Sequence, residues 1–168
     1  KSGGFNGRAN AALETTRAVF DPEFVWTYEA GVKMRSDDGR LTANVAAFHS
    51  SYKDFQARVS EVLNPDSPTP TFSFPVLNAA EMEINGFEFE GVARLGDATQ
   101  LSGQVSWMDA SYRSFEDLRT TDPANPAYDP SLHEHVPFSP DWTARIALQH
   151  AFDLGGNGTF TVGGDVAY

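Results

Sequence analysis

The stretch WTARIALQHAF, residues 142–152, alternates apolar and polar side chains with a period of two. Its even positions carry Trp142, Ala144, Ile146, Leu148, His150 and Phe152, and between them lie Thr143, Arg145, Ala147 and Gln149. Successive side chains of a β-strand point to opposite faces of a sheet, so a period of two is the pattern of a strand. The stretch therefore predicts a strand with one apolar face and one polar face.

The same alternation recurs along the chain, and prolines separate its occurrences. It is clear over residues 26–35, 87–95, 101–107 and 159–168. Proline lacks the N–H group that a central strand needs, so it collects in loops. Apart from Pro22, every proline lies between Pro65 and Pro75 or between Pro123 and Pro140. Two long loops are therefore expected, at about 57–76 and 114–140.

Short turns divide the remaining blocks into pairs of strands. Asp38-Gly39 in the turn at 37–40, Gly96 in the turn at 96–98 and Asn157-Gly158 in the turn at 153–158 supply the positive φ angles of tight hairpins. The expected fold class is all-β: an antiparallel up-and-down meander of about six strands. We predict these strands near 24–36, 40–57, 76–95, 99–115, 137–152 and 158–168.

Composition excludes several classes of protein. The 168 residues carry a formal net charge of −11, which argues against a nucleic-acid partner because phosphate binding needs a clustered basic face. The absence of cysteine excludes disulfide scaffolds, thiol catalysis and cysteine-ligated zinc. The longest unbroken apolar run, Val45 to Phe48, is far too short for a membrane-spanning helix.

Strand length separates a soluble β-sandwich from a membrane barrel. Soluble strands usually have about 5–6 residues, whereas the strands predicted near 40–57, 76–95 and 99–115 have roughly 15 or more. Long strands that join short turns at one end and long loops at the other are typical of outer-membrane barrels. An open sheet of about six strands would leave two unpaired edges in lipid, so we expect the chain to be part of a larger barrel.

Several short motifs resemble a known family. Phe20-Asp21-Pro22-Glu23, followed by Glu29-Ala30-Gly31-Val32-Lys33, resembles the "P-E … E-x-G-x-K" signature of TonB-dependent outer-membrane receptors. Asp54-Phe55-Gln56 resembles that family's "D-x-Q" strand end, and Asn78-Ala79 with Gly86-Phe87-Glu88-Phe89-Glu90 resembles its "N-A … G-x-E-x-E" strand. Asp109-Ala110-Ser111-Tyr112 and Pro137-Phe138-Ser139-Pro140 are similar to the elements that follow. The motifs occur in the family's order over about 20–168.

The resemblance implies a location and a function. Members of this family are barrels of about 22 strands plugged by an N-terminal globular domain. They lie in the outer membrane of Gram-negative bacteria and import scarce nutrients, such as iron-siderophores, cobalamin or sugars, with energy passed through TonB. The chain would then be a piece of the C-terminal part of the barrel, and it contains neither the plug nor the TonB box. The expected partners are outer-membrane lipid, the plug domain, TonB and a small-molecule nutrient.

The same resemblance orients the chain. Residues 1–23, 57–76 and 114–140 would be extracellular loops, and the short turns at 37–40, 96–98 and 153–158 would face the periplasm. No enzyme activity and no cofactor are expected. A passive porin-type barrel and a soluble carbohydrate-binding β-sandwich stay open as alternatives, because both share the alternation.

The polar face of the predicted sheet supplies the first group of candidate residues. Those expected to face the barrel lumen are Glu29, Lys33, Glu88, Glu90, Gln104 and Arg145. Their charges would contact the plug or, in the simpler interpretation, form cross-strand charge pairs that keep this face hydrated. Glu88 and Glu90 share a face, but no differentiated cleft supports a catalytic pair. The residues expected to contact lipid are Trp107, Ile146, Leu148, Phe160 and Val162.

The second long loop supplies the candidate ligand contacts. His133 and His135 offer hydrogen-bonding rings, and Trp142 offers a stacking surface where the chain re-enters the sheet. Two histidines at i and i+2 bind a metal only when further ligands converge, and no spacing supports that, so no metal site is expected. This loop is also acidic, which disfavours anionic ligands by Coulomb repulsion.

Overall fold

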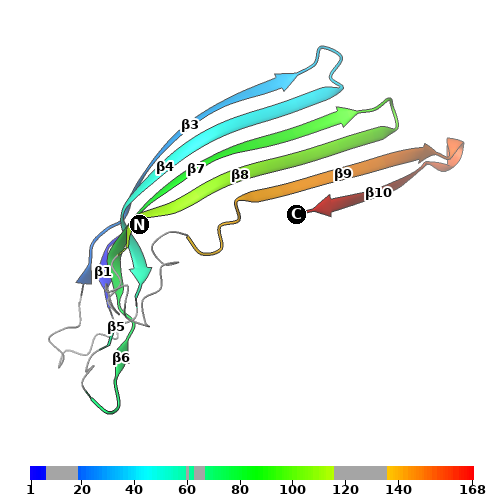
Figure 1. The fold of residues 1–168 in the computed structure, drawn as a ribbon. Helices are drawn as coiled ribbons and strands as arrows, with labels where there is room; N and C mark the ends of the chain where they lie inside the picture. The colour runs from blue at the N-terminus through cyan, green and yellow to red at the C-terminus, as the bar shows by residue number, and fades with distance from the viewer. Residues whose placement is uncertain (7–18, 60, 63–66, 116–135) are drawn as a thin grey trace. The chain divides into compact units, whose positions relative to one another are not determined.

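The structure is a computed structural model that describes residues 1–6, 19–59, 61–62, 67–115 and 136–168. Its main element is a six-stranded sheet in the order β10-β9-β8-β7-β4-β3. The strands are β3 (Phe24–Arg35), β4 (Leu41–Arg58), β7 (Val76–Arg94), β8 (Thr99–Phe115), β9 (Trp142–Asp153) and β10 (Thr159–Ala167). Figure 1 shows them side by side in this order. Two short pairs complete the fold: β1 (Gly4–Phe5) with β2 (Val19–Phe20), and β5 (Glu61–Val62) with β6 (Phe72–Ser73).

The predicted all-β meander is confirmed. Each strand of the sheet lies beside its neighbour along the chain, with the β5–β6 pair inserted in the connection from β4 to β7. The predicted start of the fifth strand at about 137 is wrong, because β9 begins at Trp142. Pro137 and Pro140 have no N–H to donate, and Phe138 between them has a φ of 61°. Strand geometry is therefore not adopted before Trp142.

The short turns have the backbone that their glycines predict. Gly39, Gly96 and Gly158 have φ angles of 68°, 84° and 102°, which side chains with a Cβ rarely adopt. The last connection also contains the 3₁₀ turn η1 (Gly155–Asn157). These residues join β3 to β4, β7 to β8 and β9 to β10 without long loops.

The β3–β4 turn carries a carboxylate cap. The Ser36 hydroxyl donates a hydrogen bond to Asp38 at 2.5 Å, and the Arg40 N–H donates a second at 3.0 Å. These bonds, the Ser36 one first, lower the pKa of the Asp38 carboxyl below its usual value. The cap therefore stabilises the turn above the ordinary pKa of an aspartate, and this contribution is lost as the pH falls through the lowered pKa.

The chain divides into two compact units. The first unit comprises 1–27, 50–84 and 110–137, and the second comprises 28–49, 85–109 and 138–168. The first unit has a small core of Val59, Leu77 and Ala79, against which Ala57 and Phe115 pack. Met82, also in this unit, is buried. β7 itself runs on unbroken from Val76 to Arg94, and its buried residues change from the odd positions Leu77 and Ala79 to the even positions Ala80 and Met82.

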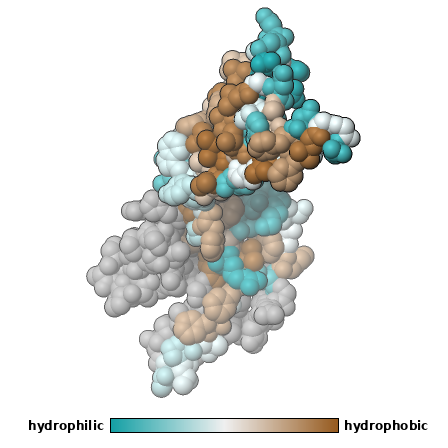
Figure 2. All heavy atoms as spheres, turned by 90° about the vertical axis from the view of Figure 1, so that its right-hand side faces the viewer, coloured by the Kyte–Doolittle hydropathy of each residue, from teal (hydrophilic) through white to brown (hydrophobic). Residues whose placement is uncertain are grey.

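The second unit separates apolar from polar side chains. On one face, aromatic side chains of neighbouring strands meet: Phe87 contacts Trp107 and Trp142, and Phe152 contacts Phe160. On the opposite face, polar groups meet across the strands in the pairs Asn44–Glu90, Ser106–Thr143 and Arg145–Asp165. Figure 2 shows hydrophobic side chains gathered together beside hydrophilic ones. We call these surfaces the apolar face and the polar face.

Most of the apolar face is open. The exposed large hydrophobic side chains of the second unit include Val32, Val45, Phe89, Ile146, Leu148, Phe160 and Val162. Within the described residues, no helix is long and apolar enough to cross a membrane. A sheet whose apolar side chains stay exposed on one face has no internal core on that side, and this is the arrangement expected for a piece of a larger barrel.

Candidate functional site: a polar groove on the sheet

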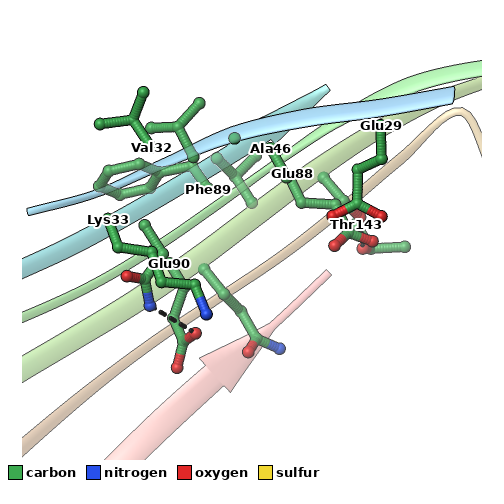
Figure 3. Close-up of a pocket in the computed structure, with 14 residues that line it drawn as sticks. Glu29, Val32, Lys33, Ala46, Glu88, Phe89, Glu90 and Thr143 are labelled. Carbon is green, nitrogen blue, oxygen red and sulfur yellow. Dashed lines mark hydrogen bonds between the residues drawn. The ribbon is translucent and has the colours of Figure 1, made fainter. Parts of the chain in front are cut away.

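The polar face of the second unit contains a groove of about 580 Å³. Its polar lining comes from β3, β4, β7, β8 and β9: Glu29, Lys33, Asn44, Glu88, Glu90, Gln104, Ser106 and Thr143. Figure 3 shows Lys33 and Glu90 on one side of the strands, and Val32 and Phe89 on the other. The strand alternation therefore brings most of the predicted polar-face residues into one site.

The groove is acidic, and its charges are largely unpaired. It holds three carboxylates and one ammonium group. Asn44 Nδ2 donates to Glu90 Oε2 at 3.4 Å, but within the described part of the chain Glu29, Lys33 and Glu88 have neither an ion pair nor a hydrogen bond from their side chains. Cross-strand charge pairing, the simpler interpretation, does not describe these three residues.

Arg145 behaves differently from the groove charges. Its Nε donates to Asp165 Oδ2 at 3.0 Å, so this guanidinium is neutralised by the neighbouring strand β10. A smaller hollow of about 260 Å³ lies around this pair and is lined by polar residues such as Gln100, Ser102 and Gln149. The polar face thus has unpaired charges over β3 and β7 and a paired, neutral region over β9 and β10.

Two glycines let the strands beneath the groove approach closely. A Cβ on Gly86 would lie 2.5 Å from Phe48 Cζ and 2.7 Å from the Trp107 carbonyl oxygen. A Cβ on Gly31 would lie 2.9 Å from the Val45 carbonyl oxygen. Only a residue without a side chain fits at these positions, which gives a physical reason for glycine in "E-x-G-x-K" and "G-x-E-x-E".

The predicted ligand contacts are divided between described and undescribed residues. His133 and His135 lie outside the described residues. Trp142 pairs with Trp107 across β8 and β9, and its ring meets Phe87 at 5.8 Å, so it belongs to the apolar face. No group of three or more potential metal-ligating side chains occurs among the residues that the structure describes.

Sequence reasoning missed a hydrogen-bond cluster in the first unit. In this cluster the carboxylate of Glu23 accepts a hydrogen bond from the backbone N–H of Gln56. The side-chain amides of Gln56 and Asn78 donate to backbone carbonyls, and both donate to the carbonyl of Asp21. In the sequence Glu23, Gln56 and Asn78 belong to separate short motifs, and they lie too far apart along the chain for a local pattern to indicate contact. No pattern in the sequence indicates that these residues meet.

A sheet of long antiparallel strands with an exposed apolar face and a charged, grooved polar face defines a segment of an outer-membrane type of β-barrel. A family profile described as "TonB dependent receptor-like, beta-barrel" matches residues 2–168. The chain belongs to this family.

A curated relative is similar over part of the chain. The metal-pseudopaline receptor CntO of Pseudomonas aeruginosa, found in two strains, is 31% identical over 111 residues. The alignment covers 66% of this chain and 14% of the relative's length. The chain therefore corresponds to a small part of that receptor.

Proposed function

We propose that the chain forms part of the barrel of an outer-membrane receptor that imports a scarce nutrient with energy supplied through TonB. The observation that carries the proposal is the family match over residues 2–168. The family's location implies the outer membrane of a Gram-negative bacterium. The match favours this proposal over a passive porin and a soluble sandwich, which share only the alternation.

The proposed ligand is a metal ion held by a small organic chelator. The support is the relative named as a metal-pseudopaline receptor, 31% identical over 111 residues. Iron-siderophores belong to this chemical class, whereas cobalamin and sugars remain alternatives that the experiment below separates. His133 and His135 stay the predicted ligand contacts, whereas Trp142 lies on the apolar face and is no longer proposed as one.

The polar groove is proposed to face the plug domain of the same receptor. Glu29, Lys33 and Glu88 are charged and have no ionic partner within the described residues. A charged side chain in a closed barrel stays hydrated or gains a partner of opposite sign, because burial without one is costly. An acidic groove of this size favours basic side chains on the plug.

The orientation is tested with spin labels in the full-length receptor in lipid. Labels at Ile146 and Arg145 occupy adjacent residues on opposite faces of β9. We expect an apolar relaxant to reach the label at 146 more readily, and a polar relaxant to reach the label at 145 more readily. The reverse pattern would place the polar face toward lipid and refute the barrel orientation.

The transport proposal is tested by uptake in a host that lacks the receptor's gene. We expect cells carrying the full-length receptor to accumulate a radiolabelled metal presented as its chelate, and to stop when TonB or the proton gradient is removed. Accumulation of the metal chelate that continues without TonB would favour the passive porin. Uptake of labelled sugar or cobalamin with no uptake of the metal chelate would keep the transport class and replace the ligand.

A further inference from the structure

The first unit contains a set of hydrogen bonds that joins three segments far apart in sequence. The segments are residues 1–6 with 19–24, the end of β4 around Asp54 and Gln56, and the start of β7 around Asn78. The side chains involved are those of Glu23, Gln56 and Asn78. These residues lie at the roots of the predicted extracellular loops, and no role follows for them from the groove.

Gln56 forms hydrogen bonds in this set through both its side-chain amide and its backbone N–H. Its Nε2 donates to the Ser2 carbonyl at 2.8 Å and to the Asp21 carbonyl at 2.9 Å. Its backbone N–H donates to Glu23 Oε2 at 3.1 Å. Gln56 is only 8% exposed, and a buried amide left without such partners would cost about 1–3 kcal/mol. Both N–H groups of the Gln56 side-chain amide thus donate to a backbone carbonyl.

Asn78 repeats the arrangement from the next strand. Its Nδ2 donates to the carbonyls of Asp21 and Asp54, each at 2.8 Å, and its Oδ1 accepts the Asp21 N–H at 2.6 Å. The Asp21 carbonyl thus accepts from both amides, and it links β4 and β7 through one oxygen. Asn6 adds a further connection, because its amide donates to and accepts from the backbone of Val76.

Asp54 explains the conformation that this set requires. Its φ is 56°, in the left-handed region, although it lies within β4. Aspartate and asparagine enter this region more readily than other residues with a side chain. The turned peptide makes the Asp54 carbonyl an acceptor for Asn78. The "P-E", "D-x-Q" and "N-A" motifs therefore meet in one place.

We propose that Gln56 and Asn78 are positioning residues of a clasp that holds the segment entering β3 against the ends of β4 and β7. We define the clasp as Asp21, Glu23, Asp54, Gln56 and Asn78 with the hydrogen bonds given above. By fixing the segment's backbone with side-chain amides, the clasp makes the roots of the first two predicted extracellular loops move as one body. This inference stands on the first unit alone and does not depend on the ligand or on energy coupling.

Gln56→Glu tests the clasp in the full-length protein without changing side-chain size. The substitution replaces the amide nitrogen and its two N–H donors with one carboxylate oxygen that faces the carbonyls of Ser2 and Asp21, so the ionised side chain is repelled. The same repulsion raises the pKa of the introduced carboxyl above its usual value, and protonation restores one donor. The clasp of the variant should therefore be broken at pH 8 and partly restored at pH 5.

Electron–electron distances between spin labels measure this opening. The labels replace Phe5 and Arg58, both exposed and both in the first unit. We expect a narrow distance distribution with Gln56, a broadened one with Gln56→Glu at pH 8, and a narrower one again at pH 5. Gln149→Glu is the matched control: the residue is exposed, its side chain makes no hydrogen bond among the described residues, and the distribution should not change with pH.

Two results overturn the proposal. One is a distribution in Gln56→Glu at pH 8 as narrow as that with Gln56. The other is a broadening that stays the same at pH 5, because loss of packing, unlike loss of a donor, does not reverse on protonation.

A measurement without mutation covers the case in which the variant does not assemble. The Asp21 N–H donates to the Asn78 side chain, outside any strand ladder. Its hydrogen exchange in the unmodified protein should be much slower than in an unstructured peptide. Exchange at the unstructured rate would show that the clasp does not persist in solution, and would refute the proposal.

Discussion

Replacement of Gly86 by valine is expected to lower the free energy of unfolding by about 3 kcal/mol, the upper part of the range for overpacking. A Cβ at this position would lie 2.5 Å from Phe48 Cζ and 2.7 Å from the Trp107 carbonyl oxygen. The Phe48 contact is with the far end of a side chain, which can shift by rotating about its bonds. The carbonyl belongs to the backbone of β8 and does not move without disturbing the ladder.

The two contacts make separate contributions, which a second substitution distinguishes. Phe48→Ala removes the ring but leaves the Trp107 carbonyl in place. The double variant Phe48→Ala with Gly86→Val should therefore recover only part of the stability lost through Gly86→Val, after correction for Phe48→Ala alone. Full recovery would mean that the backbone of β8 yields easily and that only the ring requires glycine.

Gly164→Ala is the matched control. Gly164 also lies in a central part of a strand, but a Cβ there meets nothing within 4 Å, and its φ is not in the left-handed region. Alanine should leave the stability unchanged or raise it slightly, because it restricts the unfolded chain. Chemical denaturation of the full-length receptor in lipid vesicles, followed by the difference in gel migration between folded and unfolded barrel, measures all of these variants.

Strand positions were predictable because two local signals agree. Proline marks where a ladder stops, and the period of two marks where it runs, so β3, β4, β7 and β8 begin and end within a residue or two of the predicted bounds. The predicted start of β9 at about 137 was wrong because it included Pro137 and Pro140 in the strand. Together with Phe138, whose φ angle is in the left-handed region, these prolines form a turn, and β9 begins only after it.

The contents of the polar groove were predictable for the same reason. Alternation alone assigns Glu29, Lys33, Glu88 and Gln104 to one face, and the sheet brings them together around one groove. Their lack of ionic partners could not be predicted, since it depends on register between strands. The partner of Arg145 is Asp165, for example, although Ala147 and not Arg145 lies directly opposite that aspartate.

The clasp lay beyond prediction because its bonds connect residues separated by 57 positions, as for Asp21 and Asn78. No periodicity encodes such a contact. The left-handed φ angle of Asp54 could not be predicted either, because an aspartate before an aromatic residue is typical of an ordinary strand end. The family motifs nevertheless contain every side chain of the clasp, so the short signatures record a structural requirement as well as the charges of the groove.

Ile146→Arg tests the nature of the apolar face and should produce a loss of about 2–4 kcal/mol if the residue lies near the middle of the bilayer. Ile146 is 56% exposed, and its partners across the two neighbouring strands are Gly103 and Val166. Neither carries an acidic side chain that would pair with the guanidinium. In lipid the arginine would have to bend toward the headgroups or draw water into the membrane.

Ala147→Arg is the matched control, one residue further along β9 and on the opposite face. Its cross-strand partners are Ser102 and Asp165, so an arginine there meets a hydroxyl and a carboxylate. Its free energy of unfolding should change little. Both variants include the cost of placing an arginine in a strand, so the difference between their free energies of unfolding reports the environments of the two faces. The denaturation assay in lipid vesicles measures both free energies.

The same pair of variants decides between barrel and sandwich. In a soluble sandwich the apolar face would pack against a second sheet, and Ile146→Arg would destabilise the protein in buffer without any lipid. In a barrel the variant should lose stability in vesicles of long-chain lipid and lose less in thin bilayers, where an arginine reaches the interface with less distortion. A loss that does not depend on bilayer thickness, or a larger loss for Ala147→Arg than for Ile146→Arg, would refute the assignment of the apolar face to lipid.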